Sequence, residues 1–219
     1  MRANFYVDGY NLYRGMCDAG LHGHIWLDLQ GLCNNLKKRT ETLGRIRYFT
    51  SLPDFAPAKA RRHQTYLDSL EAACPRVEVE FGTFSDKDAR VYCDICKIEI
   101  RVECAACGWK MNTKKHEEKQ TDVNLAVHLL NDAYTPNEFD VAYIISGDSD
   151  LLPAVRMVKS IFPEKKVGMY FPPSRYLGVF TGVADCAVGI HANEIKRFPL
   201  PDRVGGATGP IAKPPSWNS

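Results

Sequence analysis

The chain has 219 residues, 45% hydrophobic and 25% charged, a composition typical of a folded globular protein and unlike that of a disordered chain. Its 28 basic and 26 acidic side chains leave a formal charge of +2, which excludes strong bulk attraction to nucleic acids or membranes. Apolar runs such as 141–145 are far shorter than a bilayer span, and the N-terminus leads into a predicted strand without a signal sequence. We therefore expect a cytoplasmic protein without membrane contact, formed by one domain and an appendage.

Strand and helix patterns alternate along the first 81 residues. The apolar run 4–8 ends in Asp8-Gly9 and predicts a buried strand, followed by a helix whose main part carries the leucines of 27–36 and ends near Gly44. Alternation over 45–50 predicts a second strand, and 58–73 predicts a helix with Pro57 in its first turn. Alternation over 76–81 predicts a third strand near an edge of the sheet.

The same alternation of strand and helix patterns resumes in the second half of the chain. A helix is predicted over 121–134, with Thr121 as its N-cap, then a strand over 139–146, a helix over 150–162 and a strand over 166–171. This alternation predicts an α/β fold, a mostly parallel sheet covered by helices on both faces. Residues 1–198 form the predicted domain, 85–118 are an insertion within it, and the Pro/Gly-rich 199–219 are predicted to be a flexible tail.

Four of the eight cysteines occur in two Cys-x₂-Cys pairs, the spacing of a tetrahedral zinc site: Cys93, Cys96, Cys104 and Cys107. The residues between the pairs must fold back for one ion to bind all four cysteines. Because the protein then supplies all four ligands, the zinc is predicted to be structural rather than catalytic. The alternatives are four reduced thiols in a small core, or His116 in place of one ligand. The other cysteines are expected to be small buried residues.

An aromatic residue stands among cations next to the second cysteine pair: Trp109, Lys110, Lys114 and Lys115. Such a combination is typical of contacts with single-stranded nucleic acid. The alternative is a solvated charged run that continues into Glu117 and Glu118. A second basic set, Lys59, Arg61 and Arg62, could contact phosphates, although a solvated helix surface explains it better.

Acidic residues follow two predicted strands: Asp8 follows the first, and Asp148 and Asp150 follow the strand at 141–145. Ligands of open α/β sheets bind outside the carboxyl ends of the strands, where the strand order reverses. In the order 3-2-1-4-5 these two strands are neighbours about 5 Å apart, and Asp122 starts a helix on the same side. Carboxylates about 4 Å apart repel by about 4 kcal/mol at an effective dielectric near 20. The alternative for each single acid is a turn or a favourable place at a helix N-terminus.

Because these carboxylates repel one another, the cluster as a whole predicts a site for hard cations such as Mg²⁺ or Mn²⁺. Such ions at this place predict phosphodiester hydrolysis. Phosphate loops of the G-x-G-x-x-G or G-x-x-x-x-G-K-[ST] kind do not occur in the sequence.

Three segments carry a family resemblance: 5–13 (FYVDGYNLY), 117–126 (EEKQTDVNLA) and 144–153 (IISGDSDLLP). They resemble the signature blocks of the NYN domain, the LabA-like branch of the PIN-like nuclease superfamily, here with an inserted zinc-knuckle module. The resemblance implies a Rossmann-like PIN fold, dependence on Mg²⁺ or Mn²⁺ and RNA as substrate. The family's acidic positions fall on Asp8, Asp122, Asp148 and Asp150, and its polar position on Asn11. Tyr10 stands where relatives often have Asn.

The resulting hypothesis is a metal-dependent ribonuclease acting on single-stranded RNA, in which the four aspartates hold the ions. Nearby groups would position water or substrate: Asn11, Lys119, Thr121, Ser146 and Ser149. One alternative is a non-catalytic RNA-binding or regulatory assembly module of the same fold. Another is a phosphohydrolase for small phosphorylated molecules. RNA is the expected partner, and a homodimer is compatible with the sequence.

Overall fold

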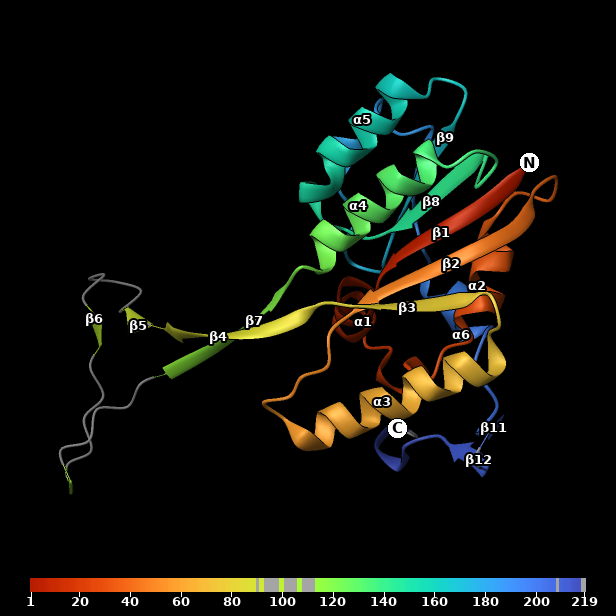
Figure 1. Ribbon diagram of the computed structural model, residues 1–219. Helices are drawn as coiled ribbons and strands as arrows, with labels where there is room; N and C mark the ends of the chain where they lie inside the picture. Colours follow the sequence, from red (N-terminus) through yellow and green to blue (C-terminus); the bar gives the residue numbers. More distant parts are fainter. Residues whose placement is uncertain (90, 93–98, 101–105, 108–112, 208, 218–219) are drawn as a thin grey trace.

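A six-stranded, wholly parallel sheet forms the centre of the computed structural model, which describes residues 1–89, 91–92, 99–100, 106–107, 113–207 and 209–217 (Figure 1). The strand order is β10-β9-β8-β1-β2-β3, so β1 and β8 are neighbours at the point where the order reverses. The strands are β1 (Arg2–Asp8), β2 (Thr42–Thr50), β3 (Val77–Phe81), β8 (Val141–Ile145), β9 (Lys166–Phe171) and β10 (Cys186–Gly189). The predicted order is confirmed and extended by β10, which sequence patterns did not predict.

Helices cover both faces of the sheet, as predicted. The helices are α1 (Gly9–Asp18), α2 (Leu29–Leu36), α3 (Pro57–Ala73), α4 (Thr121–Tyr134), α5 (Leu152–Ile161) and α6 (Ala192–Lys196). Because side chains of a strand alternate between faces, Phe5 and Val7 pack with α1, α2 and α3 on one side of β1. Tyr6 packs with α4 and α5 on the other. The two apolar layers bury both faces of the sheet. The carboxyl ends of the strands are not covered by these layers and continue into loops.

The segment between β1 and β2 forms two helices, whereas one was predicted. α1 ends at Asp18 with Ala19 as its C-cap, and Gly20 follows with a φ of +72°, a backbone conformation that glycine adopts without strain. A short 3₁₀ turn, η1 (His22–His24), comes next. The Asp28 side chain then accepts a hydrogen bond from the Gly31 amide and caps a new helix, α2. The break lets α1 start directly at the carboxyl end of β1.

The C-terminal segment packs on the domain, and the prediction of a flexible tail is wrong for the described part. β11 (Arg203–Gly206) and β12 (Gly209–Ala212) form an antiparallel hairpin beside α3 (Figure 1). Leu200 and Val204 are buried, and the Trp217 ring lies 6.2 Å from that of Trp26. The segment contains few apolar residues, but these three pack against the domain and hold the segment on it.

An antiparallel arm made of β4 (Thr83–Ala89) and β7 (Thr113–Lys119) projects from the sheet between β3 and α4 (Figure 1). Most of this arm belongs to the predicted insertion at 85–118, and of the residues between its two strands the short strands β5 (Val91–Tyr92) and β6 (Glu99–Ile100) are described. The arm therefore connects the insertion to the sheet beside the start of α4. In the described part of the chain, no helix is long and apolar enough to cross a membrane.

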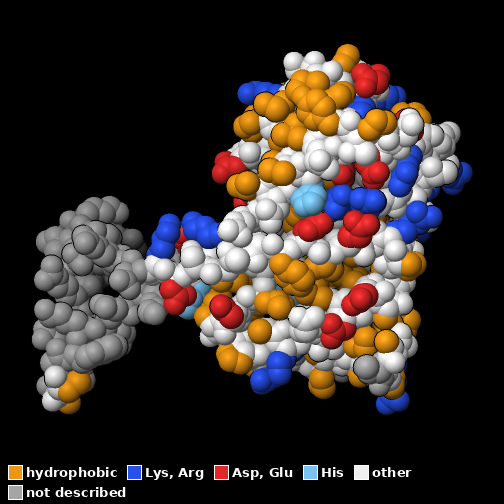
Figure 2. All heavy atoms as spheres, viewed as in Figure 1, with side chains coloured by type: hydrophobic (Ala, Val, Ile, Leu, Met, Phe, Trp, Pro, Cys, Tyr) orange, Lys and Arg blue, Asp and Glu red, His pale blue; other side chains and the backbone are white. Residues whose placement is uncertain are grey.

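Apolar side chains remain exposed on the outer sides of α4 and α5, where hydrophobic atoms gather in Figure 2. They include Val123, Val127, Tyr134, Met157 and Ile161. Such a patch is compatible with a homodimer, which stays a prediction.

Candidate active site

Asp8 lies at the carboxyl end of β1 and is only 4% exposed. One carboxylate oxygen, Oδ1, accepts a hydrogen bond from the Asn11 amide at 2.9 Å and so caps α1. The other, Oδ2, accepts one from the Ser146 hydroxyl, also at 2.9 Å. Ser146 follows β8, so this bond joins the ends of the two strands between which the strand order reverses.

The loop after β8 is held by hydrogen bonds that start at the same buried serine. The Ser146 hydroxyl oxygen accepts the Asp148 amide at 3.1 Å, and Asp148 Oδ1 accepts the Asp150 amide at 2.8 Å. The Asn11 side-chain oxygen accepts the Gly147 amide at 2.9 Å. A Cβ at Gly147 would lie 2.5 Å from the Arg175 carbonyl oxygen, so glycine is required at this close approach. Asn11 and Ser146 thus position Asp8 and Asp148, whereas Ser149 is exposed.

Asp122 enters from the first turn of α4, and Glu118 from the end of β7. The Thr121 hydroxyl donates to Glu118 Oε1 at 2.8 Å and lies 3.4 Å from the Ser51 hydroxyl. Gln120, with a φ of +73°, is the N-cap of α4 in place of the predicted Thr121.

Sequence reasoning missed Glu118 and Ser51 as members of this site. Glu118 is half-buried yet stands in a run of charged residues that looks solvated, and the available signal was its place four residues before Asp122.

Five carboxylates therefore surround the ends of β1, β7 and β8 and form what we call the acidic edge: Asp8, Glu118, Asp122, Asp148 and Asp150. Burial raises the pKa of Asp8 to about 7, and the charges of Asp122 and Glu118 add to that rise. The pKa of Asp122 is raised by burial and then by the charges of Asp148 and Asp150. The pKa of Glu118 is raised by burial and by Asp122. The acids act on one another across the edge.

Lys119 was predicted to position water or substrate, and in the structure its ammonium group pairs with Glu117 at 3.1 Å. Because side chains alternate along β7, Glu117 and Lys119 lie on the strand face opposite Glu118. This cation therefore belongs to an ion pair on the arm.

Within the ranges that the structure describes, no group of three or more acidic, histidine or cysteine side chains is arranged to hold a metal ion. The chemistry of the acidic edge nevertheless fits a hard divalent cation, because all its donors are oxygens and three of its acids have raised pKa values. Metal binding at the edge is a proposal taken up below.

Most of the predicted zinc and nucleic-acid contacts lie outside the described residues. This holds for Cys93, Cys96, Cys104, Trp109 and Lys110, while Cys107 is exposed. Lys114 and Lys115 lie in β7, opposite Asp88 and Lys87 of β4. The structural zinc and the contacts of these cations therefore stay predictions.

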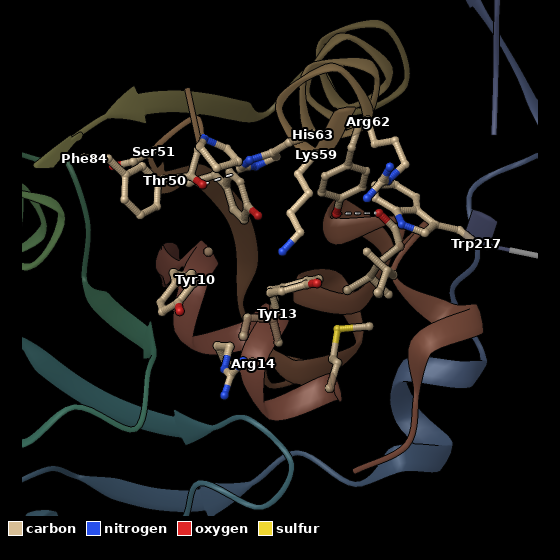
Figure 3. A pocket seen from close by; sticks show the side chains of 18 of the residues that line it. Tyr10, Tyr13, Arg14, Thr50, Ser51, Lys59, Arg62, His63, Phe84 and Trp217 are labelled. Atoms are coloured by element: carbon tan, nitrogen blue, oxygen red, sulfur yellow. Dashed lines mark hydrogen bonds between the residues drawn. The ribbon is translucent and has the colours of Figure 1, made fainter. Parts of the chain in front are cut away.

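A pocket of about 270 Å³, which we call the α1–α3 pocket, opens beside the acidic edge (Figure 3). One face of α1 lines it with Tyr10, Tyr13 and Arg14, at helical spacing. The facing side of α3 contributes Lys59, Arg62, His63 and Tyr66, again at i, i+3, i+4 and i+7. Of the second basic set, Lys59 and Arg62 thus line the α1–α3 pocket, whereas Arg61 lies outside it and, with Arg62, lines a separate hollow next to the C-terminal segment.

The buried side chain of His63 makes the free energy of unfolding depend on pH. Burial lowers its pKa to about 4, from an ordinary value near 6.5. The folded chain therefore binds this proton less readily than the unfolded chain, and the resulting stabilisation is complete above about pH 6.5 and is lost as the pH falls toward 4. At pH 5 the loss is about 2 kcal/mol. We expect His63→Gln, which does not titrate, to lose correspondingly less stability than wild type between pH 7 and pH 5 in urea unfolding.

The matched control is His22→Gln, since His22 is exposed. It should lose as much stability as wild type over the same pH interval. An equal loss in wild type and in His63→Gln would contradict the prediction.

A parallel sheet with acids at the reversal of its strand order defines the class of Rossmann-like α/β proteins with a polar site at that edge. Residues 2–173 match the model of the NYN domain, and the chain belongs to this family, which is a family of PIN-like nucleases. This confirms the family and the α/β PIN-like fold.

Two similar proteins show how far the likeness extends. The 6-hydroxy-3-succinoylpyridine 3-monooxygenase HspA of Pseudomonas putida (strain DSM 28022 / S16) is 28% identical over 260 aligned positions, which cover 99% of this chain and 75% of that protein. The crystal structure of VPA0982, a protein of unknown function from Vibrio parahaemolyticus RIMD 2210633, has a TM-score of 0.52 and 17% identity. It covers 91% of this chain and 96% of that chain, and shows similarity of fold alone.

Proposed function

We propose that the chain is a metal-dependent ribonuclease that hydrolyses phosphodiester bonds of single-stranded RNA at the acidic edge. The observation that carries this proposal is the hydrogen-bonded connection from Asp8 through Ser146 to Asp148, with Asp122 close enough for its charge to raise the pKa of Asp8. Carboxylates brought together at this cost in repulsion are typical of sites that bind hard divalent cations.

Each residue of the acidic edge and its neighbours would have a distinct role in this reaction. Asp8, Asp122, Asp148 and Asp150 would hold Mg²⁺ or Mn²⁺, which supplies an activated water and compensates negative charge on the phosphate. Asn11 and Ser146 keep the loop after β8 in place through their hydrogen bonds, and Thr121 orients Glu118.

The finer assignments accompany the ribonuclease proposal. They are membership of the LabA-like branch, a cytoplasmic location, and a structural Zn²⁺ on Cys93, Cys96, Cys104 and Cys107.

The test is incubation of the purified protein with labelled single-stranded RNA, single-stranded DNA and duplexes, in Mn²⁺, Mg²⁺ or EDTA. We expect cleavage of single-stranded RNA that needs a divalent ion and stops in EDTA. Binding that persists in EDTA without product in any metal would overturn the nuclease and favour a non-catalytic RNA-binding module.

A second candidate comes from the relative named as a monooxygenase of a hydroxypyridine. The aromatic and cationic lining of the α1–α3 pocket would also suit a planar anionic ring. A monooxygenase inserts one atom of O₂ and reduces the other to water with two electrons from a donor. Oxygen uptake with 6-hydroxy-3-succinoylpyridine and NADH or reduced flavin, with hydroxylated product, would support this candidate; absence of both would exclude it for that substrate and those donors.

A further inference from the structure

The α1–α3 pocket shares a wall with the acidic edge. Gly9, which lines the pocket, directly follows Asp8, and a Cβ at Gly9 would lie 2.7 Å from the hydroxyl oxygen of Tyr48, another lining residue. Ser51 also lines the pocket and lies 3.4 Å from Thr121, the residue that bonds Glu118. The pocket therefore adjoins the acidic edge through Gly9 and Ser51, although none of the five carboxylates lines it.

Three cations line this pocket without an acidic partner. The side chains of Arg14, Lys59 and Arg62 make no ion pair or hydrogen bond with any described residue, whereas those of Arg45, Arg47, Lys159 and Arg175 all pair with acids. In Figure 3 Lys59 extends into the space between α3 and α1. Two guanidinium groups and an ammonium group around one concave surface are suited to a phosphate.

Aromatic rings surround the same space. Tyr10 and Tyr13 are 47% and 42% exposed and line the pocket. On the far wall, the Phe55 ring stacks on His116 at 3.7 Å with an interplanar angle of 2°, and Phe84 meets Phe55 edge-on. His116 and Phe84 come from the β4–β7 arm, so the base of the insertion forms part of this wall. Exposed rings beside cations are stacking surfaces for bases of single-stranded nucleic acid.

Polar groups at the inner end of the pocket could hydrogen-bond to the edge of a base. His63 Nε2 lies 3.3 Å from the Thr50 hydroxyl, and both residues line the pocket (Figure 3). The volume, about 270 Å³, is just below the range of about 300–1,000 Å³ typical of small-molecule sites. The space therefore suits one nucleotide and is too small for several.

We propose that the α1–α3 pocket is a nucleotide subsite that takes one base of the RNA strand against Tyr10 and Tyr13 and holds its phosphate with Arg14, Lys59 and Arg62. The inference rests on the proposed function and deepens it, since it states where the strand is held relative to the acidic edge. A base must leave its stack to enter a pocket, and this favours single strands over duplexes.

The test is calorimetric binding in EDTA, which prevents metal-dependent cleavage, with 5′-AMP, 5′-UMP, ribose 5-phosphate and a short oligoribonucleotide. We expect Tyr13→Ala and Arg62→Ala each to weaken binding of the oligoribonucleotide about 10-fold or more, in line with the loss of a stacked base or a phosphate contact. Arg61→Ala is the matched control, because it removes the same charge from the next residue of α3, which does not line the pocket. Tyr134→Ala is the aromatic control on α4. Both controls should bind as wild type does.

Several outcomes would overturn the subsite. These are nucleotides that bind no better than ribose 5-phosphate, equal affinities in Arg62→Ala and Arg61→Ala, or a clear preference for 6-hydroxy-3-succinoylpyridine. Tight binding of a mononucleotide that the oligoribonucleotide fails to displace would assign the pocket to a free nucleotide and overturn the strand subsite.

The two proposals fail separately. Metal-dependent cleavage that is unaffected by Tyr13→Ala and Arg62→Ala would reject the subsite alone. Binding that depends on the pocket, without cleavage in any metal, would reject the nuclease alone.

Discussion

Asp148→Asn is expected to lower the rate of metal-dependent RNA cleavage by about 10²–10³-fold, the typical cost of removing one group that stabilises charge at a reacting centre. The fold should be unchanged. Asp148 Oδ1 accepts the Asp150 amide at 2.8 Å, and the amide oxygen of asparagine can accept the same bond. The substitution removes only the negative charge, and that charge contributes to the raised pKa of Asp122. The measurement is the single-turnover cleavage rate in Mn²⁺, with thermal unfolding to check the fold.

Asp68→Asn is the matched control for this charge change. Asp68 is exposed on α3 and accepts a hydrogen bond from Gln64, which asparagine can also accept. The control should cleave at the wild-type rate. Full activity in Asp148→Asn would contradict the assignment of the acidic edge as the catalytic site.

The fold was predictable where the sequence carries continuous apolar runs or clear alternation. β1 and β8 are central strands buried on both faces, so they appear as unbroken apolar segments, and β3 alternates because it is an edge strand. β10 was missed because its apolar run is only four residues long, ends in glycine and is not fully buried. The break between α1 and α2 depends on the backbone conformation of Gly20 and on the Asp28 cap, which are weak signals inside a leucine-rich segment.

The acids of the candidate site could be predicted because the reversal of strand order places the ends of β1 and β8 side by side. Glu118 could not, because in β7 charged residues occupy both strand faces and no alternation marks the buried one. The α1–α3 pocket was also missed. Each of its helix faces looks like an ordinary solvated surface, and the pocket exists only because α1 and α3 face each other.

Asp132→Ala is expected to lower the free energy of unfolding by about 3 kcal/mol, because it removes a buried carboxylate that accepts three hydrogen bonds, while Arg47 keeps its ion pairs with Glu78 and Glu80. The Asp132 side chain is only 3% exposed and that of Arg47 9%. Asp132 accepts Arg47 Nε at 2.9 Å, Arg47 Nη2 at 3.2 Å and the Tyr6 hydroxyl at 2.8 Å. These bonds tie α4 to β2 and β1, so their loss loosens the helix that carries Asp122. The measurement is urea unfolding at pH 7.

Lys159→Ala is the matched control for this ion pair, because Lys159 binds both oxygens of Asp185 at 2.8 and 2.7 Å near the surface. Water solvates the freed carboxylate there, so the control should cost no more than about 1 kcal/mol. Equal losses in the two variants would show that the burial of the Asp132 hydrogen bonds does not set the cost. A larger loss in Asp132→Ala would have a consequence for the site, since α4 delivers Asp122 to the acidic edge through its first turn. Under partly destabilising conditions this variant should therefore lose cleavage activity before it unfolds globally, whereas Lys159→Ala should keep its activity up to its own unfolding transition.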